Sequence, residues 1–79
     1  MYYVYLLRSV IHPDKTYIGC TNDLEQRLAE HNRSTSPHNS AHKPWQVEMY
    51  LVFKDKSKAI AFEKYLKSGS GRAFTNKHF

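Results

Sequence analysis

The 79-residue sequence has little of several residue types, and each shortage narrows the class of protein. Cys20 is the single cysteine, so no disulfide can form within the chain, and nothing indicates an oxidising compartment. No apolar run approaches the roughly 20 residues that a membrane-spanning helix needs. Met1 leads directly into a strand pattern rather than a signal peptide, and no linker or repeat divides the sequence. We therefore expect one cytoplasmic domain over residues 1–79, with the modest core of a short chain.

Acidic residues are also scarce relative to basic ones. Seven Asp and Glu stand against twelve Lys and Arg, which gives a net charge of +5 and a pI near 9.5. This balance favours an anionic partner, of which nucleic acid is the commonest, although small basic proteins are ordinary. The five histidines and Cys20 do not have a recognised zinc-ligand spacing, so we do not expect a zinc site.

Apolar periodicity and turn residues predict a mixed α/β domain. Strands are expected at 2–8, 15–20 and 46–54, helices at 23–31 and 56–67, a short helix or tail at 72–79, and a mobile surface loop at 32–43. Both faces of the first strand are apolar or aromatic, as suits a central strand. The first two strands are expected to form a hairpin. If residues 6 and 16 pair, Tyr5 lies opposite Tyr17 on one side of the sheet.

The segment Thr16–Asn32 combines a short strand that ends near Gly19 with a helix. Asn22 is the expected N-cap of that helix, with Glu25 three residues on as in a capping box. One helix face carries an apolar stripe with two polar groups at its border: Leu24, Arg27, Leu28 and His31. A cation held there is partly desolvated and acts more strongly on an anionic ligand. We therefore interpret this segment as one wall of an active site.

Two later elements complete the predicted core. The third strand places one alternate set on a single side of the sheet: Val47, Met49, Leu51 and Phe53. The following helix, with Ser57 as its expected cap, has one apolar face that also contains a carboxylate: Ala59, Phe62, Glu63 and Leu66. Gly69 and Gly71 are expected to break the chain after this helix.

These inward-facing groups are the parts that phosphodiester hydrolysis requires. A carboxylate such as Glu63 can hold Mg²⁺, and the fork of Arg27 matches a phosphate. A tyrosine or His31 can accept a proton from water, and Gly19 leaves room for a DNA backbone. The same residues have structural alternatives. Tyr5 and Tyr17 can be ordinary strand residues, Arg27 and Glu63 can form ion pairs, and His31 can stabilise a helix end.

Five motifs in chain order resemble the GIY-YIG nuclease family. They are Tyr3–Tyr5 (YVY), Tyr17–Gly19 (YIG), Leu24–Leu28 (LEQRL), Glu30–Asn32 (EHN) and Ala61–Lys64 (AFEK). The resemblance covers nearly the whole chain. The segment Leu66–Arg72 and the pair Pro44-Trp45 are similar to those of small, stand-alone bacterial members. This resemblance implies a central three-stranded antiparallel sheet flanked by helices. It also implies hydrolysis of DNA with Mg²⁺ or Mn²⁺. The expected substrate is branched or nicked DNA, and the expected role is in DNA repair or recombination.

The resemblance also implies a role for each matching residue. Tyr5 or Tyr17 would position or deprotonate the attacking water, together with His31. Arg27 would hold the scissile phosphate, and Glu63 would be the single protein ligand of the metal. Asn76 matches a C-terminal family asparagine by order only, and His42 lies in a loop that aligns too loosely for transfer.

The sequence departs from the family pattern in two ways. Tyr3 stands where the family name has glycine, and we expect no separate DNA-targeting domain of the kind that well-characterised members carry. Two competing functions are therefore kept. One is a DNA-binding module of the same fold with weak or no turnover, held to phosphates by its basic surface. The other is a protein-interaction or structural module, which has less use for the polar set.

Overall fold

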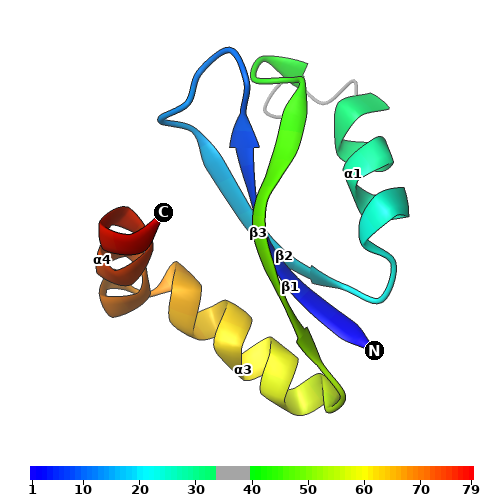
Figure 1. The fold of residues 1–79 in the computed structure, drawn as a ribbon, viewed down its shortest axis with the longest axis vertical. Helices are drawn as coiled ribbons and strands as arrows, with labels where there is room; N and C mark the ends of the chain where they lie inside the picture. The colour runs from blue at the N-terminus through cyan, green and yellow to red at the C-terminus, as the bar shows by residue number, and fades with distance from the viewer. Residues whose placement is uncertain (34–39) are drawn as a thin grey trace.

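The computed structural model describes residues 1–33 and 40–79 and contains a three-stranded antiparallel sheet with helices on both sides (Figure 1). The elements are β1 (Tyr2–Ser9), β2 (Thr16–Thr21), α1 (Leu24–Arg33), β3 (Trp45–Phe53), α3 (Lys56–Lys67) and α4 (Gly69–His78). The predicted α/β class and three-stranded sheet are confirmed, and the C-terminal segment is a full helix. Half of the predicted mobile loop, residues 34–39, lies outside the described residues, and its first two residues belong to α1.

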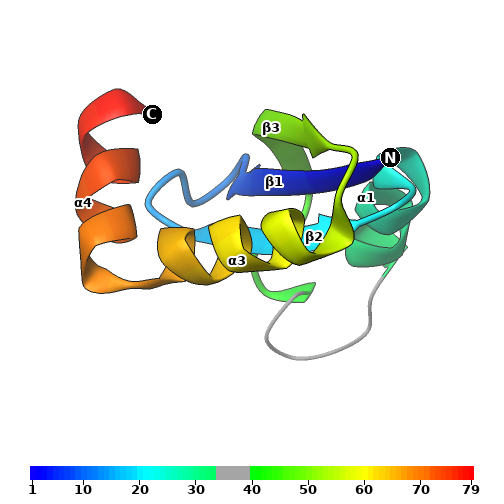
Figure 2. The same cartoon turned by 90° about the horizontal axis from the view of Figure 1, so that it is seen from below.

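The strand β1 is central, in the order β2–β1–β3, and its two faces are covered from opposite sides. On one face, Val4 packs with Ala59 and Leu66 of α3. On the other face, Tyr5 lies in a second cluster to which Leu28 of α1 adds its side chain. Figure 1 shows α1 and α3 on opposite sides of the sheet, and Figure 2 shows α3 running along β1 and β2. The expectation of a strand buried on both faces is confirmed.

The register of the β1–β2 hairpin differs from the predicted one by two residues. Tyr5 pairs with Gly19, and Leu7 pairs with Tyr17. The loop closes through a backbone hydrogen bond from Ser9 N to the carbonyl of Lys15 at 3.0 Å, so the strand pairing ends at Arg8 and Thr16. A shift of two residues keeps every side chain on its original face. Tyr5 and Tyr17 therefore still project from the same side of the sheet.

A β-bulge in β3 overturns the predicted alternation of that strand. Leu6 pairs with Met49 while Leu7 pairs with Val47, so Glu48 is the extra residue. A bulge residue reverses the faces of the side chains beyond it. Val47 accordingly packs in the cluster around Tyr5, whereas Phe53 packs in the cluster around Val4. The prediction that Val47 and Phe53 share one side is wrong for this reason.

Aspartates, rather than the predicted residues, cap the two main helices. Asp23 accepts a hydrogen bond from Gln26 N at 3.1 Å, so the predicted cap one residue earlier, at Asn22, is wrong. Asp55, not Ser57, caps α3 and accepts from Ser57 N at 2.8 Å. In each case the aspartate directly precedes the first helical residue, and its carboxylate accepts a hydrogen bond from a free N–H group of the first turn.

The junction of α3 and α4 also differs from the prediction. Ser68 separates the two helices, and its hydroxyl accepts from Gly71 N at 3.2 Å, while Gly69 and Gly71 lie inside the first turn of α4. A Cβ added at Gly71 would lie 2.5 Å from Cα of Leu66, so the glycine allows α4 to pack closely on α3. Within residues 1–33 and 40–79, no helix is long and apolar enough to cross a membrane.

Candidate active site

Tyr5 starts in the central strand, but its phenol lies across the neighbouring edge strand β2. Gly19 stands directly opposite, and directly opposed residues project to the same face of a sheet. A Cβ added at Gly19 would lie 2.6 Å from Cζ of Tyr5 and closer still to the hydroxyl. The space above Gly19 is therefore filled by Tyr5. The structure thus gives this glycine a role other than the predicted one of admitting a DNA backbone.

The hydroxyl of Tyr5 is buried, and charged side chains on α1 and α3 influence its pKa. Burial and then the neighbouring Tyr17 raise the pKa of Tyr5 to about 12, against the opposing effect of Arg27. The guanidinium of Arg27 lies close, but not in hydrogen-bond geometry, so this oxygen has no hydrogen-bond partner among the described residues. At neutral pH the phenol keeps its proton and is a hydrogen-bond donor.

Tyr17 and His31 pack next to this phenol. The ring centroids of Tyr17 and Tyr5 are 6.4 Å apart, with an angle of 25° between the planes. The imidazole of His31 lies 4.5 Å from the Tyr17 ring at 60°. Burial and then the charge of Arg27 lower the pKa of His31. His31 therefore favours its neutral form at pH 7 and holds one face of Tyr17.

His31 lies deeper than the sequence indicates. It was expected at the border of the apolar stripe, but its exposed fraction is only 7%. The next residue explains the difference. The side-chain amide of Asn32 accepts from Trp45 N at 2.6 Å and donates to its carbonyl at 3.1 Å, which ties the end of α1 to the start of β3. We missed Asn32 as a positioning residue; its place after His31 in the EHN motif was the available signal.

Arg27 and Glu63 reach the same edge of the sheet from helices on opposite sides. Burial raises the pKa of Cys20; next, the charge of Glu63 raises it further, whereas Arg27 lowers it. The same two charges act with the same signs on the Tyr5 hydroxyl. Because such interactions weaken with distance, both charges are near enough to influence Cys20 of β2 and the Tyr5 hydroxyl beside it. Because β2 is an edge strand, side chains from helices on the two sides of the sheet can approach each other around it.

Glu63 already has one partner in the structure. Its carboxylate forms an ion pair with Lys67 at 2.9 Å, and the two side chains are 20% and 52% exposed. This ion pair is the structural alternative foreseen for Glu63, and its partner is Lys67. In the described part of the chain, Arg27 forms no ion pair. The pair leaves Glu63 with unused acceptor positions, because an ionised carboxylate can accept several hydrogen bonds.

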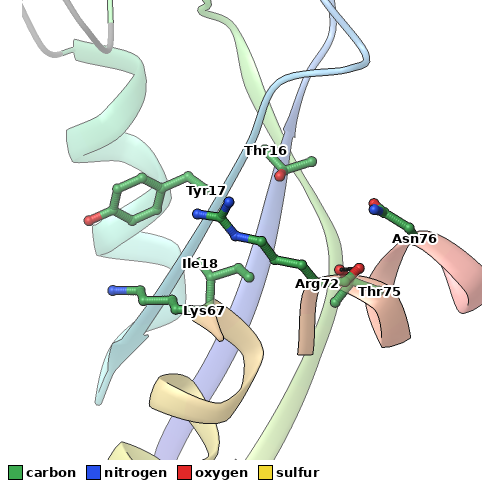
Figure 3. Close-up of a pocket in the computed structure, with 7 residues that line it drawn as sticks. All are labelled: Thr16, Tyr17, Ile18, Lys67, Arg72, Thr75 and Asn76. Carbon is green, nitrogen blue, oxygen red and sulfur yellow. Dashed lines mark hydrogen bonds between the residues drawn. The ribbon is translucent and has the colours of Figure 1, made fainter. Parts of the chain in front are cut away.

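A cavity of about 420 Å³ opens beside this cluster, between β2 and the C-terminal helices (Figure 3). Its lining residues are Thr16, Tyr17, Ile18, Lys67, Arg72, Thr75 and Asn76. Tyr17 is the wall that the cavity shares with the tyrosine cluster. Asn76, matched to the family only by order, thus lies on this cavity. His42 lies elsewhere, with its ring 5.5 Å from that of His12 and 6.2 Å from that of Trp45.

Comparisons with known proteins agree with this arrangement. The model of the GIY-YIG catalytic domain matches residues 1–77. Similar curated proteins are structure-specific endonuclease subunits SLX1 of three fungi. The chain is 35% identical over 68 residues to that of Cryptococcus neoformans, 34% over 67 to that of Malassezia globosa and 37% over 68 to that of Debaryomyces hansenii.

These alignments cover 78–80% of the chain but only 14–19% of the relatives, so the chain spans less than a fifth of the proteins it matches. Because the relatives are fungal, they do not support the expected resemblance to bacterial members. The motif order, the sheet topology and the match over residues 1–77 lead to one conclusion: this chain belongs to the GIY-YIG family and has the fold of its nuclease domain.

Proposed function

We propose that this domain is a DNA endonuclease whose active site lies at the outer edge of β2. One observation carries the proposal: the buried Tyr5 packs with Tyr17 and His31 beside an open cavity. The charges of Arg27 on α1 and Glu63 on α3, helices on opposite sides of the sheet, both influence the pKa of the Tyr5 hydroxyl. A cation and a carboxylate placed around a buried phenol are the groups that bind a phosphodiester and stabilise its charged transition state. A module that only binds DNA has no need for a carboxylate at this point.

The two tyrosines receive different roles in this proposal. Tyr17 is half-buried and borders the open cavity, so it orients the attacking water. Tyr5 is fully buried with a pKa of about 12, so it stays protonated and donates a hydrogen bond to a substrate oxygen. His31, neutral and packed on the Tyr17 ring, keeps that ring in place. Arg27 binds the phosphate that is cleaved.

Glu63 is the residue that would hold a divalent cation, Mg²⁺ or Mn²⁺. The described residues contain no cluster of three His, Cys, Asp or Glu side chains that could hold a metal ion, so we propose Glu63 as a ligand that acts without such a cluster. This donor set fits Mg²⁺, which often takes one or two carboxylates together with substrate phosphate and water. When bound, the ion supplies positive charge for the phosphoryl group and the leaving oxygen. When a metal ion binds Glu63, the ion pair between Lys67 and Glu63 must either persist on the other carboxylate oxygen or break.

The proposed substrate is DNA with a branch or a nick. The support is the printed name of the relatives, structure-specific endonuclease subunits, together with the net charge of +5. A role in DNA repair or recombination and a cytoplasmic location, both expected from the sequence, remain predictions. The relatives' names also contain the word subunit, so we propose that this domain acts together with a partner protein.

A cleavage assay tests this function. Purified protein is incubated with branched, nicked and plain duplex DNA in Mg²⁺, Mn²⁺ or EDTA. We expect metal-dependent products, which Glu63→Gln and Arg27→Gln abolish or reduce at least a hundredfold, since each removes stabilisation of the transition state. Glu25→Gln and Arg33→Gln, which change exposed residues of the same types on α1, serve as matched controls.

Two results would reject the endonuclease. One is undiminished cutting by both site variants, which would point to a contaminating nuclease. The other is salt-sensitive binding of DNA in EDTA that gives no product when either metal is added, which would favour the binding module.

A further inference from the structure

The basic cavity between β2 and α4 has no part in the chemistry proposed above, apart from sharing Tyr17 as a wall. Its charged lining residues are Lys67 and Arg72, and no carboxylate lines it. The remaining polar side chains are neutral. The hydroxyls of Thr16 and Tyr17 and the amide of Asn76 can donate hydrogen bonds, whereas the Thr75 hydroxyl already donates to a backbone carbonyl. A hollow lined by two cations and several neutral donors, with no acid, matches an anion better than a cation or an apolar group.

Arg72 is the residue in this cavity that is most available to a ligand. Lys67 is engaged with Glu63, but the side chain of Arg72 has no hydrogen-bond or ion-pair partner in the described part of the chain. Figure 3 shows this side chain extending from α4 toward Tyr17 and β2. A guanidinium group presents a planar fork of donors that matches two phosphate oxygens at once. Its chemistry therefore points to a phosphate group.

The backbone around Arg72 fixes the place of this arginine without using its side chain. The hydroxyl of Ser68 accepts from Gly71 N, and the carbonyl of Arg72 accepts from the Thr75 hydroxyl at 3.0 Å. Close packing of Gly71 on Leu66 sets the distance of α4 from α3. The helix junction thus places the backbone of Arg72, and the donors of its side chain are left for a ligand.

We propose that this cavity binds the phosphodiester next to the cleaved one on the same DNA strand, with Arg72 as its main ligand. The inference rests on the proposed endonuclease function and deepens it. Tyr17 borders the cavity and packs against Tyr5, so in this proposal it separates the phosphate bound by Arg27 from the neighbouring phosphate bound by Arg72. Arg72 then sets which bond of the strand is placed at Glu63.

A scan with neutral phosphate replacements tests this placement. A methylphosphonate, which removes one negative charge, is introduced at each position around the cleavage site in turn. For the wild type, we expect replacement at one adjacent position to raise KM on the order of tenfold, since a charge-assisted hydrogen bond is lost, with little change in kcat. Arg72→Gln should raise KM about as much on unmodified DNA, and the two changes together should add little, because they remove the same contact.

Arg33→Gln is the matched control, because this exposed arginine at the end of α1 does not line the cavity. The rise in KM caused by Arg33→Gln should multiply with the rise caused by a methylphosphonate, whichever position carries the methylphosphonate. The same multiplication for Arg72→Gln at all positions would overturn the proposal. Arg72→Lys keeps the charge but loses the fork, so its KM should lie between those of the wild type and Arg72→Gln. Such an intermediate KM would show that the effect of Arg72→Gln does not come from misfolding.

A binding experiment separates this inference from the proposed function. Fluorescence anisotropy in EDTA, with the same DNA series and the Glu63→Gln background, measures phosphate contacts without any turnover. If wild-type protein cuts no DNA, the endonuclease fails, and the cavity is still judged by binding. A single position where methylphosphonate and Arg72→Gln are not additive supports the phosphate site, and full additivity at every position rejects it.

Discussion

Replacement of Gly19 by alanine tests the contact on which the geometry of the site depends. The added methyl group would lie 2.6 Å from Cζ of Tyr5 and nearer to the hydroxyl, so the phenol must move. Overpacking of a core costs about 1–3 kcal/mol, and alanine recovers about 0.5–1 kcal/mol of backbone entropy that glycine loses in a strand. We expect a net destabilisation of about 1–2 kcal/mol. In a domain of this size that lowers Tm by about 4–16 °C.

Thermal unfolding and DNA cleavage measure the two consequences of Gly19→Ala. Cleavage should fall by more than the loss of folded protein explains, because the displaced phenol leaves its place beside Tyr17 and His31. A second background separates this contact from a general strand effect. In Tyr5→Leu, which lacks the hydroxyl and Cζ, the same alanine should cost little or even stabilise the protein. An equal cost in both backgrounds would refute the proposed contact between Gly19 and Tyr5.

Three further predictions follow from buried and tightly packed groups. Gly71→Ala should destabilise the protein by about 1–3 kcal/mol in chemical denaturation, because its Cβ meets the backbone of α3, whereas Gly69→Ala, with nothing within 4 Å, should be neutral or stabilising by up to about 1 kcal/mol. The pKa of His31 is lowered in the folded state, so stability should fall as pH drops below 6.5, and His31→Phe should flatten this part of a stability-against-pH curve; an unchanged slope would contradict the cause. Because the pKa of Tyr5 is raised to about 12, the free energy of unfolding should fall by about 2–3 kcal/mol between pH 10 and 12. Unfolding measurements on Tyr5→Phe should show a smaller fall over the same pH range.

Periodicity was sufficient to predict most of the architecture. The apolar character of both faces of β1 predicted a buried central strand, and the helix over Lys56–Lys67 was predicted with its observed bounds. The bulge at Glu48 was not predictable, because an inserted residue leaves a sequence that still alternates. The caps were misplaced because Asn22 and Ser57 are also good capping residues, and only the backbone geometry shows which residue precedes the first turn.

The site was predictable as a set of residues but not as an arrangement. Helical spacing placed Arg27 and His31 on one face of α1, yet the depth of His31 depends on the Asn32 contacts with Trp45, which join distant segments. The spacing also gave no sign that Gly19 makes room for Tyr5, because that requires the hairpin register. Arg72 carries no periodic signal at all, since its position follows from the close packing of Gly71.

Paramagnetic broadening by Mn²⁺ tests most directly whether the metal, the carboxylate and the tyrosines share the edge of β2. In backbone amide NMR spectra, low concentrations of Mn²⁺ should broaden the signals of Gly19, Cys20 and Lys67 in the wild type and spare them in Glu63→Gln. Broadening centred on His12 and His42 instead, or broadening at β2 that survives the loss of the Glu63 carboxylate, would contradict this account.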